Sequence, residues 1–181
     1  MWRHLPARPP DGWTMGADAT EKLRINGIKL SEELVQINLS PGGEVSAGRL
    51  FRELAVRRIN LPLVVLAADQ EGVAGACCLA ADDLPLAQPI IDKIRDGVRI
   101  IPAVGALTVF PHRTRFDLLG RVLGAFSRRR MPVHAIASSL AALTLTTDFG
   151  GLEAALAAVQ EVAALPENHA PFRPQFKVWQ I

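Results

Sequence analysis

The fold is decided by one stretch of sequence, HRTRFDLLGRVLGAFSRRRMPVHAIASSLAALTLTTD, residues 112–148. In its first part, four apolar residues recur at the spacing that places them on one face of a helix: Phe116, Leu119, Leu123 and Phe126. Two largely apolar segments of strand length follow, residues 131–138 and 141–147. The stretch therefore predicts one helix and then two strands.

The same pattern occurs a second time, 72 residues earlier in the chain. The shift superposes three pairs of segments: residues 48–49 on 120–121, 57–58 on 129–130, and 61–67 on 133–139. Self-similarity at a fixed offset is the signature of a repeated structural unit. The chain is therefore predicted to contain two copies of one module.

Each copy predicts the order β-α-β-β-α-β, the split βαβ unit that forms a four-stranded antiparallel sheet with both helices on one face. The first copy has expected strands at 34–39, 61–66, 73–81 and 98–101, and expected helices that begin near Ala47 and at Asp82 or Asp83. The second copy has expected strands at 106–110, 131–138, 141–147 and 175–181, and expected helices at 116–126 and 152–165.

We therefore predict an α+β fold of two ferredoxin-like units, residues 30–103 and 104–181, after a Pro- and Gly-rich flexible arm at residues 1–22. The face of each sheet that carries no helix is not strongly polar in its sequence pattern. We expect it to be covered, by pairing of the two units or by a second chain, and we favour a homodimer.

Composition excludes several classes of protein. The 181 residues carry a formal net charge of only +2, which argues against a dedicated polyanion binder. Aromatic residues make up 6% of the chain and Tyr is absent, which argues against an RNA-recognition module that stacks bases. No run approaches the roughly 20 apolar residues of a membrane-spanning helix, and no secretory signal is expected. We expect a cytoplasmic protein.

The reactive residues indicate neither a metal nor a cofactor. Cys77 and Cys78 are adjacent, so they form no disulfide framework and are expected to act as small apolar residues in a reducing compartment. The four histidines have no metal-ligand spacing, and no dinucleotide or phosphate-binding loop motif follows a strand. We therefore expect no metal site and no cofactor.

Two equivalent loops are candidate ligand sites. The first contains Ser40, Gly42, Gly43, Glu44 and Val45. Its glycines would let the backbone approach a ligand, and the amides at the following helix N-terminus suit a carboxylate or phosphate. The alternative is a plain turn in which Ser46 caps the helix.

The second loop contains His112, Arg113, Thr114 and Phe116, where arginine could bind an acidic ligand; the alternative is a solvated basic loop. Further candidates lie on or beside strands: Asn60, His134, Ser138 and Ser139. The arginines at 128–130 are expected to complement a helix C-terminus, or else to form a docking patch for an acidic partner.

Residues 112–148 resemble the ACT domain, and most of all the regulatory ACT domains of aspartokinases. The segment MPVHAIASS followed by LTLTTD is similar to that family's strand pair, and SPGGEVSAGRLFRELAVRRIN, residues 40–60, is similar to the general ACT pattern. The two matches span about residues 34–165. The resemblance implies a non-catalytic unit in which loop amides bind an amino-acid carboxylate. Asn60 or His134 would contact the rest of the ligand.

Two positions depart from the family pattern. His134 stands where the family has an aspartate, and Leu140 stands where it has a glutamate. In lysine-regulated aspartokinases these carboxylates help recognise an ammonium, so the resemblance gives no support to lysine as the effector. A chain of 181 residues is also too short for an aspartokinase catalytic domain.

The sequence thus favours an amino-acid-binding regulatory or sensor protein, with the effector bound between units and the signal passed to a separate enzyme of amino-acid metabolism. One alternative is a detached regulatory small subunit of aspartokinase or acetolactate synthase type, because LGRVLGAFSRRR, residues 119–130, also resembles the latter. Another is a small ferredoxin-like enzyme, for which Cys77 would be the only reactive candidate.

Overall fold

The computed structural model describes residues 22–40, 47–70, 72–94, 97–110, 116–139 and 141–169. The predicted N-terminal arm, apart from its last residue, and the predicted strand at 175–181 lie outside these ranges.

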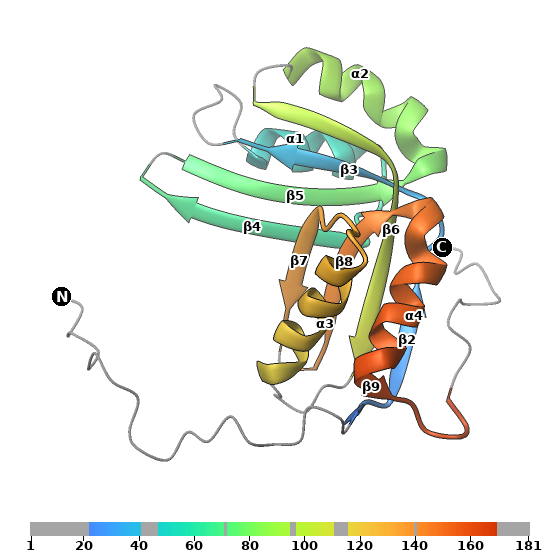
Figure 1. Cartoon of the computed structure of the whole chain (residues 1–181). Helices are drawn as coiled ribbons and strands as arrows, with labels where there is room; N and C mark the ends of the chain where they lie inside the picture. The colour runs from blue at the N-terminus through green and yellow to red at the C-terminus, as the bar shows by residue number, and fades with distance from the viewer. Residues whose placement is uncertain are drawn as a thin grey trace.

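The described residues form an α+β fold, as predicted (Figure 1). The strands are β1 (Leu23–Arg24), β2 (Gly27–Leu30), β3 (Leu34–Leu39), β4 (Leu63–Asp69), β5 (Gly72–Ala80), β6 (Val98–Phe110), β7 (Ala135–Ser138), β8 (Leu143–Asp148) and β9 (Ala163–Ala164). The helices are α1 (Ala47–Val56), α2 (Leu84–Ile94), α3 (Phe116–Arg128) and α4 (Leu152–Val162), with 3-10 turns η1 (Ala81–Asp83) and η2 (Phe149–Gly151). Asp82 and Asp83 lie inside η1, where no side chain caps the turn.

One antiparallel sheet runs through the molecule in the order β4-β5-β3-β6-β8-β7, and β2 pairs with β6 beside it. We call β3, β4, β5, α1, α2 and the start of β6 the first half, and β2, β7, β8, α3, α4 and the end of β6 the second half. The first half has the β-α-β-β-α-β order predicted for residues 30–103. In the second half, β2, a strand that the sequence did not predict, pairs with β6.

Strand β6 belongs to both halves. The sequence suggested two strands, 98–101 and 106–110, but residues 98–110 form one strand. Pro102 lacks a backbone N–H, and Ala103 has a φ of 51°, so the strand bulges there and does not end. The pairing with β3 shifts by one residue at this bulge, between Leu34 and Gln36.

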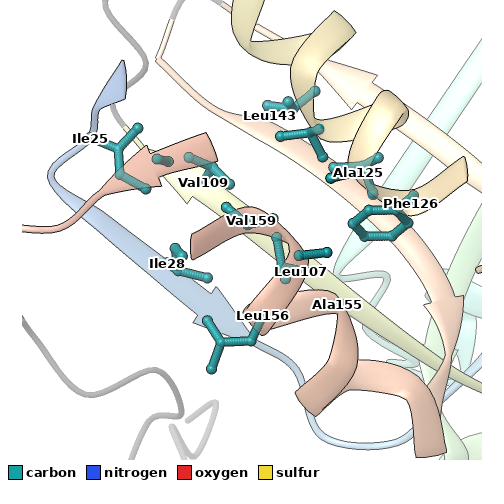
Figure 2. Packing of buried hydrophobic residues seen from close by; sticks show 14 of the residues in the cluster. Ile25, Ile28, Leu107, Val109, Ala125, Phe126, Leu143, Ala155, Leu156 and Val159 are labelled. Carbon is teal, nitrogen blue, oxygen red and sulfur yellow. The ribbon is translucent and has the colours of Figure 1, made fainter. Parts of the chain in front are cut away.

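Each half has its own core between the sheet and a pair of helices. Under α1 and α2, the core includes Val35, Ile37, Leu54, Leu79 and Ile91. Under α3 and α4, it includes Ile28, Leu107, Val109, Phe126 and Val159, which interdigitate in Figure 2. Periodicity in the sequence predicted part of both sets, such as Leu54, Phe126 and Val159, because alternate strand residues and every third or fourth helical residue face the core. The face expected for α3 was partly wrong: Leu118, Val122 and Ala125 are buried with Phe126, whereas Leu119 and Leu123 are only partly buried.

The ends of α1 and α3 have the same geometry, which explains the repeated arginines. Arg58 and Arg130 both adopt the left-handed conformation, with φ of 56° and 53°. After each of them, an amide donates back to a carbonyl five residues earlier, from Ile59 to Leu54 at 3.1 Å and from Met131 to Phe126 at 3.0 Å. Both helices therefore end in the same C-terminal motif.

The face of the sheet without helices is turned inward. Leu34, Cys78 and Ala106 form a small buried cluster on that face. Strands β4 and β7, at opposite ends of the strand order, contact each other. The sheet therefore curls so that the two halves cover much of each other's helix-free face, which is one of the ways of covering that the sequence led us to expect.

Gly105 of β6 tests the packing of α4 on the sheet. A Cβ at this buried position would lie 2.5 Å from Cγ of Leu152, the first residue of α4. We expect Gly105→Ala to lower the free energy of unfolding by about 1–3 kcal/mol, measured by urea denaturation. The matched control is Gly120→Ala in α3, where a Cβ meets no atom within 4 Å. It should raise stability by up to about 1 kcal/mol, and equal effects of the two changes would contradict the packing.

Candidate functional site

The two candidate loops fall largely outside the described residues. Those outside are Gly42, Gly43, Glu44, Val45, His112, Arg113 and Thr114. Ser40 is exposed at the end of β3, and its amide donates to the Gly97 carbonyl at 2.8 Å. Phe116 is the first residue of α3. The predicted carboxylate contacts of these loops therefore remain predictions.

The strand candidates are divided between the halves. Asn60 is exposed in the segment between α1 and β4, in the first half. His134 precedes β7 in the second half, and Ser138 and Ser139 lie at the other end of that strand. Ser138 shares a strand face with Ile136, which packs against the core under α3 and α4. Ser139 is engaged in the β7–β8 turn, where its Oγ accepts from the amides of Ala141 and Ala142.

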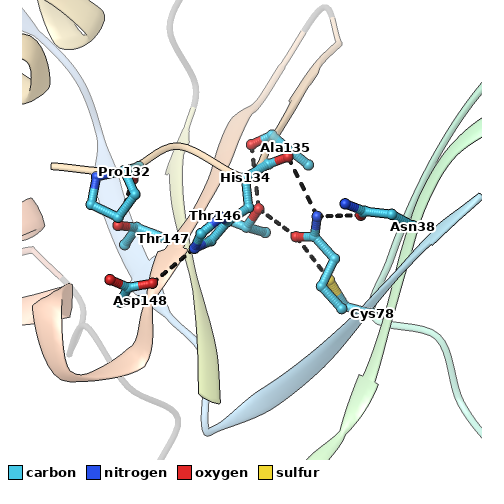
Figure 3. Close-up of polar contacts among 9 residues, drawn as sticks. Asn38, Cys78, Pro132, His134, Ala135, Thr146, Thr147 and Asp148 are labelled. Atoms are coloured by element: carbon cyan, nitrogen blue, oxygen red, sulfur yellow. Dashed lines mark hydrogen bonds and ion pairs between the residues drawn. The ribbon is translucent and has the colours of Figure 1, made fainter. Parts of the chain in front are cut away.

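His134 lies where the two halves meet. Its amide donates to the Thr146 carbonyl at 2.9 Å, and its carbonyl oxygen is 3.4 Å from Nε2 of Gln36. Its ring nitrogen Nε2 is 2.8 Å from Oδ1 of Asp148, at the end of β8 (Figure 3). Asp148 thus supplies a carboxylate beside the position where the ACT family pattern has an acidic residue and this chain has histidine.

Gln36 is the centre of the polar network between the halves. Its side chain is fully buried on the helix-free face. Nε2 donates to Oδ1 of Asn38 at 2.7 Å, and Oε1 accepts from the Thr146 hydroxyl at 2.7 Å. The Cys78 thiol, a weak donor, lies 4.0 Å from Oε1 (Figure 3). Every polar group of this buried amide therefore has a partner, drawn from strands β3, β5 and β8 and from the residue before β7.

Sequence reasoning missed Gln36, although it carries a signal. It is the one fully buried polar residue in the strand LVQINL, residues 34–39, in which Val35 and Ile37 face the helices. A polar residue between apolar neighbours indicated a special contact on the other face. The partner, Thr146, lies 110 residues away, so the contact itself depends on the tertiary fold.

The cysteine thiols are poor nucleophiles in this environment. Both side chains are fully buried. Burial, and secondarily the adjacent Cys78, raises the pKa of Cys77 to about 12. Burial raises the pKa of Cys78 to about 11. Because the thiolate is the reactive form, the geometry gives no support to the alternative in which Cys77 is a catalytic nucleophile.

Within the ranges that the structure describes, no group of three or more His, Cys, Asp or Glu side chains is placed to hold a metal ion. No helix among the described residues has the length and hydropathy needed to cross a membrane.

Comparison with known proteins identifies what this fold is similar to. No protein-family model and no curated protein sequence matches the chain. Among solved structures, the regulatory subunits of aspartate kinase from Thermus thermophilus and Thermus flavus superpose with a TM-score of 0.64 each. Their identities to this chain are 18% and 19%, and in both cases 76% of this chain covers 97% of the subunit.

A whole kinase matches over only part of its length. Aspartate kinase from Clostridium acetobutylicum superposes with a TM-score of 0.65 at 12% identity, and 78% of this chain covers 36% of that enzyme. The resemblance to aspartokinase regulatory domains that the sequence predicted is thereby confirmed at the level of the fold. The chain has the α+β, ferredoxin-like fold of those domains.

Cysteine reactivity tests the thiol environment. In the native protein at pH 8, both thiols should be protonated and buried, so neither should react with Ellman's reagent until the protein unfolds. The expected result is no labelling in buffer and two equivalents in guanidinium chloride. A Ser138→Cys variant, with an exposed thiol, is the positive control and should react at once. Rapid native labelling of the unmodified protein would contradict the assigned burial.

Proposed function

We propose that this chain is a non-catalytic, amino-acid-binding regulatory or sensor protein of the cytoplasm. The observation that carries the proposal is the fold, which aligns with nearly the whole of two regulatory subunits of aspartate kinase. The buried cysteines also support it. Their raised pKa values make Cys77, the nucleophile considered for the enzymatic alternative, a poor one.

The proposed organisation is two ACT-like units, residues 30–103 and 104–181, with β2 as a further strand of the second unit. The repeated sequence and the matching ends of α1 and α3 support this division. The chain aligns with 97% of two regulatory subunits that are separate chains. This coverage favours a detached regulatory subunit of an aspartokinase-type enzyme. The enzyme that receives the signal would then be carried on another chain.

The proposed ligand is a small amino acid or related metabolite. Its carboxylate would lie on the amides of residues 42–45 or 112–116, and Asn60 or His134 would read the rest of the molecule. The His134 carbonyl is within reach of Gln36, and Gln36 is bonded to Thr146. A ligand that moves His134 would therefore also change the contact between the halves, which gives the differential interaction that regulation requires.

A thermal-shift screen against the proteinogenic amino acids tests ligand binding. A ligand at 100 times its Kd should stabilise the protein by about 2.7 kcal/mol and raise the melting temperature. Asn60→Ala should reduce that shift, whereas Asn168→Ala, at an exposed position of the second half, should not. If no amino acid shifts the melting temperature, the proposed ligand class is wrong.

We also propose a homodimer through the outer part of strand β4. β4 ends the strand order, and three large apolar side chains of the β4–β5 hairpin are 36–44% exposed: Val64, Leu66 and Val73. An apolar edge strand of this kind is stabilised by pairing with another strand. The two hairpins would extend one sheet across the dimer axis.

Substitution of Leu66 tests this interface. Leu66→Lys places a charge in the proposed contact and should convert the dimer to a monomer in analytical ultracentrifugation. Leu86→Lys makes the same chemical change at an exposed residue of α2 and should leave the dimer intact. If the unmodified protein sediments as a monomer at all concentrations, the proposed dimer is contradicted.

A further inference from the structure

A small hollow lies between α1 and α2. Its volume is about 60 Å³, and six residues line it: Arg49, Glu53, Arg57, Ile90, Lys93 and Ile94. Ile90 and Ile94 are buried and form its apolar part. Pockets that hold whole small molecules are larger, roughly 300–1,000 Å³. The hollow therefore fits one functional group with a short apolar stem.

The hollow has an excess of positive charge. Arg49 and Glu53 lie on α1, and Arg57 directly follows its last residue; their intervals of four residues place them in one row. Arg57 donates back to the Glu53 carboxylate at 3.1 Å. In the part of the chain that the structure describes, Arg49 and Lys93 have no ion-pair or hydrogen-bond partner. Three cations thus share one carboxylate.

The residues between α3 and α4 in the second half can be compared with those that line the hollow between α1 and α2. The repeat offset of 72 aligns Arg57 with Arg129. Helices α2 and α4 align at an offset of 68, since this shift superposes the buried residues 87, 90 and 91 on the buried residues 155, 158 and 159. Lys93 then aligns with Glu161.

Glu161 joins α4 to the C-terminal end of α3 through two ion pairs. Its Oε1 accepts from Nη2 of Arg129 at 2.5 Å, and its Oε2 lies 3.7 Å from Nη2 of Arg128. Arg129 also donates from Nη1 to the Ala154 carbonyl at 3.0 Å. In the first half, a lysine replaces this glutamate, so Arg57 turns back to Glu53 on its own helix. The cationic cluster between α1 and α2 therefore contains the carboxylate of Glu53 but lacks the one that Glu161 provides in the second half.

Two exposed apolar residues lie on the same two helices, close in the chain to residues that line the hollow. Val56, beside Arg57, is 75% exposed and aligns with Arg128 of the second half. Leu86, one helical turn before Ile90, is 56% exposed. Free ions gain nothing from such side chains, whereas apolar residues around a charged contact are typical of protein interfaces.

We propose that the hollow between α1 and α2 binds the carboxylate of a glutamate or aspartate side chain of a partner protein. The side-chain stem would lie on Ile90 and Ile94, and the carboxylate would accept from Arg49, Arg57 and Lys93, as Glu161 accepts from arginines in the second half. Exposed cations bind a free anion weakly, so the apolar residues on either side of the partner's carboxylate would add affinity by contact with Val56 and Leu86. The inference stands apart from the proposed amino-acid site, with which it shares no residue.

Titration with a capped peptide, acetyl-Leu-Glu-Leu-amide, tests the proposal in the full chain. The guanidinium Nε–H signals of Arg49 and Arg57 are followed by NMR in about 20 mM salt, where charge screening is weak. We expect saturable shifts with this peptide and none with the glutamine analogue acetyl-Leu-Gln-Leu-amide. Absence of saturable shifts with the glutamate peptide overturns the proposal.

Charge reversal at residue 93 distinguishes binding in the hollow from attraction by the net charge of the protein. Lys93→Glu supplies the carboxylate from within the chain and should weaken peptide binding about tenfold or more, the loss of one charge-assisted hydrogen bond. Lys22→Glu makes the same charge change at an exposed residue away from the hollow and should have little effect. Equal weakening by both variants overturns the proposal.

Two further measurements complete the test. Glu161→Lys removes the carboxylate of the second half and should create a second peptide site, seen at Arg128 and Arg129. Inorganic phosphate and acetate are titrated in parallel. If either binds as tightly as the glutamate peptide, the assignment to a partner's side chain is overturned in favour of a free anion.

Discussion

Strand β6 is the constraint on which the rest of the structure depends. It pairs with β3 along its first part and with β2 and β8 along its second part, so both halves of the sheet share one backbone. The bulge at Pro102 and Ala103 lets the strand continue and bend. The bend brings β4 and β7 into contact and turns the helix-free face inward. The covered face, the polar network and the separate helix pairs all follow from this arrangement.

The inward face contains a polar group that must be satisfied. Leaving a buried amide without partners costs about 1–3 kcal/mol, which is a large share of the stability of a small protein. Gln36 avoids this cost only while Asn38, His134 and Thr146 hold their positions. The network therefore specifies one relative placement of the two halves. A ligand that engages His134 would act on this same contact, which is why the proposed regulation centres on it.

The two helix pairs have the same plan and different surfaces. In the second half, Glu161 joins α4 to the end of α3 through ion pairs with Arg128 and Arg129. In the first half, Lys93 stands in the corresponding place and lines the hollow between α1 and α2. The two helix pairs thus differ: one is joined by ion pairs, and the other carries the hollow that we propose for a partner's carboxylate. The exposed hairpin of the first half adds to the same asymmetry.

The sequence alone determined the four helices, most of the strands, the 72-residue repeat and the fold class. Each of these is a local property: apolar periodicity defines helices such as α3, and the 72-residue offset matches Arg58 with Arg130 because both helices end alike. The tertiary structure alone decided that β6 is continuous, that β2 lies beside it and that Gln36 meets Thr146. These contacts join residues far apart in the chain, and no local pattern encodes them. The difference between Lys93 and Glu161 needed both kinds of information. The two residues are visible in the sequence, but their equivalence appears only when α2 and α4 are aligned by their buried residues.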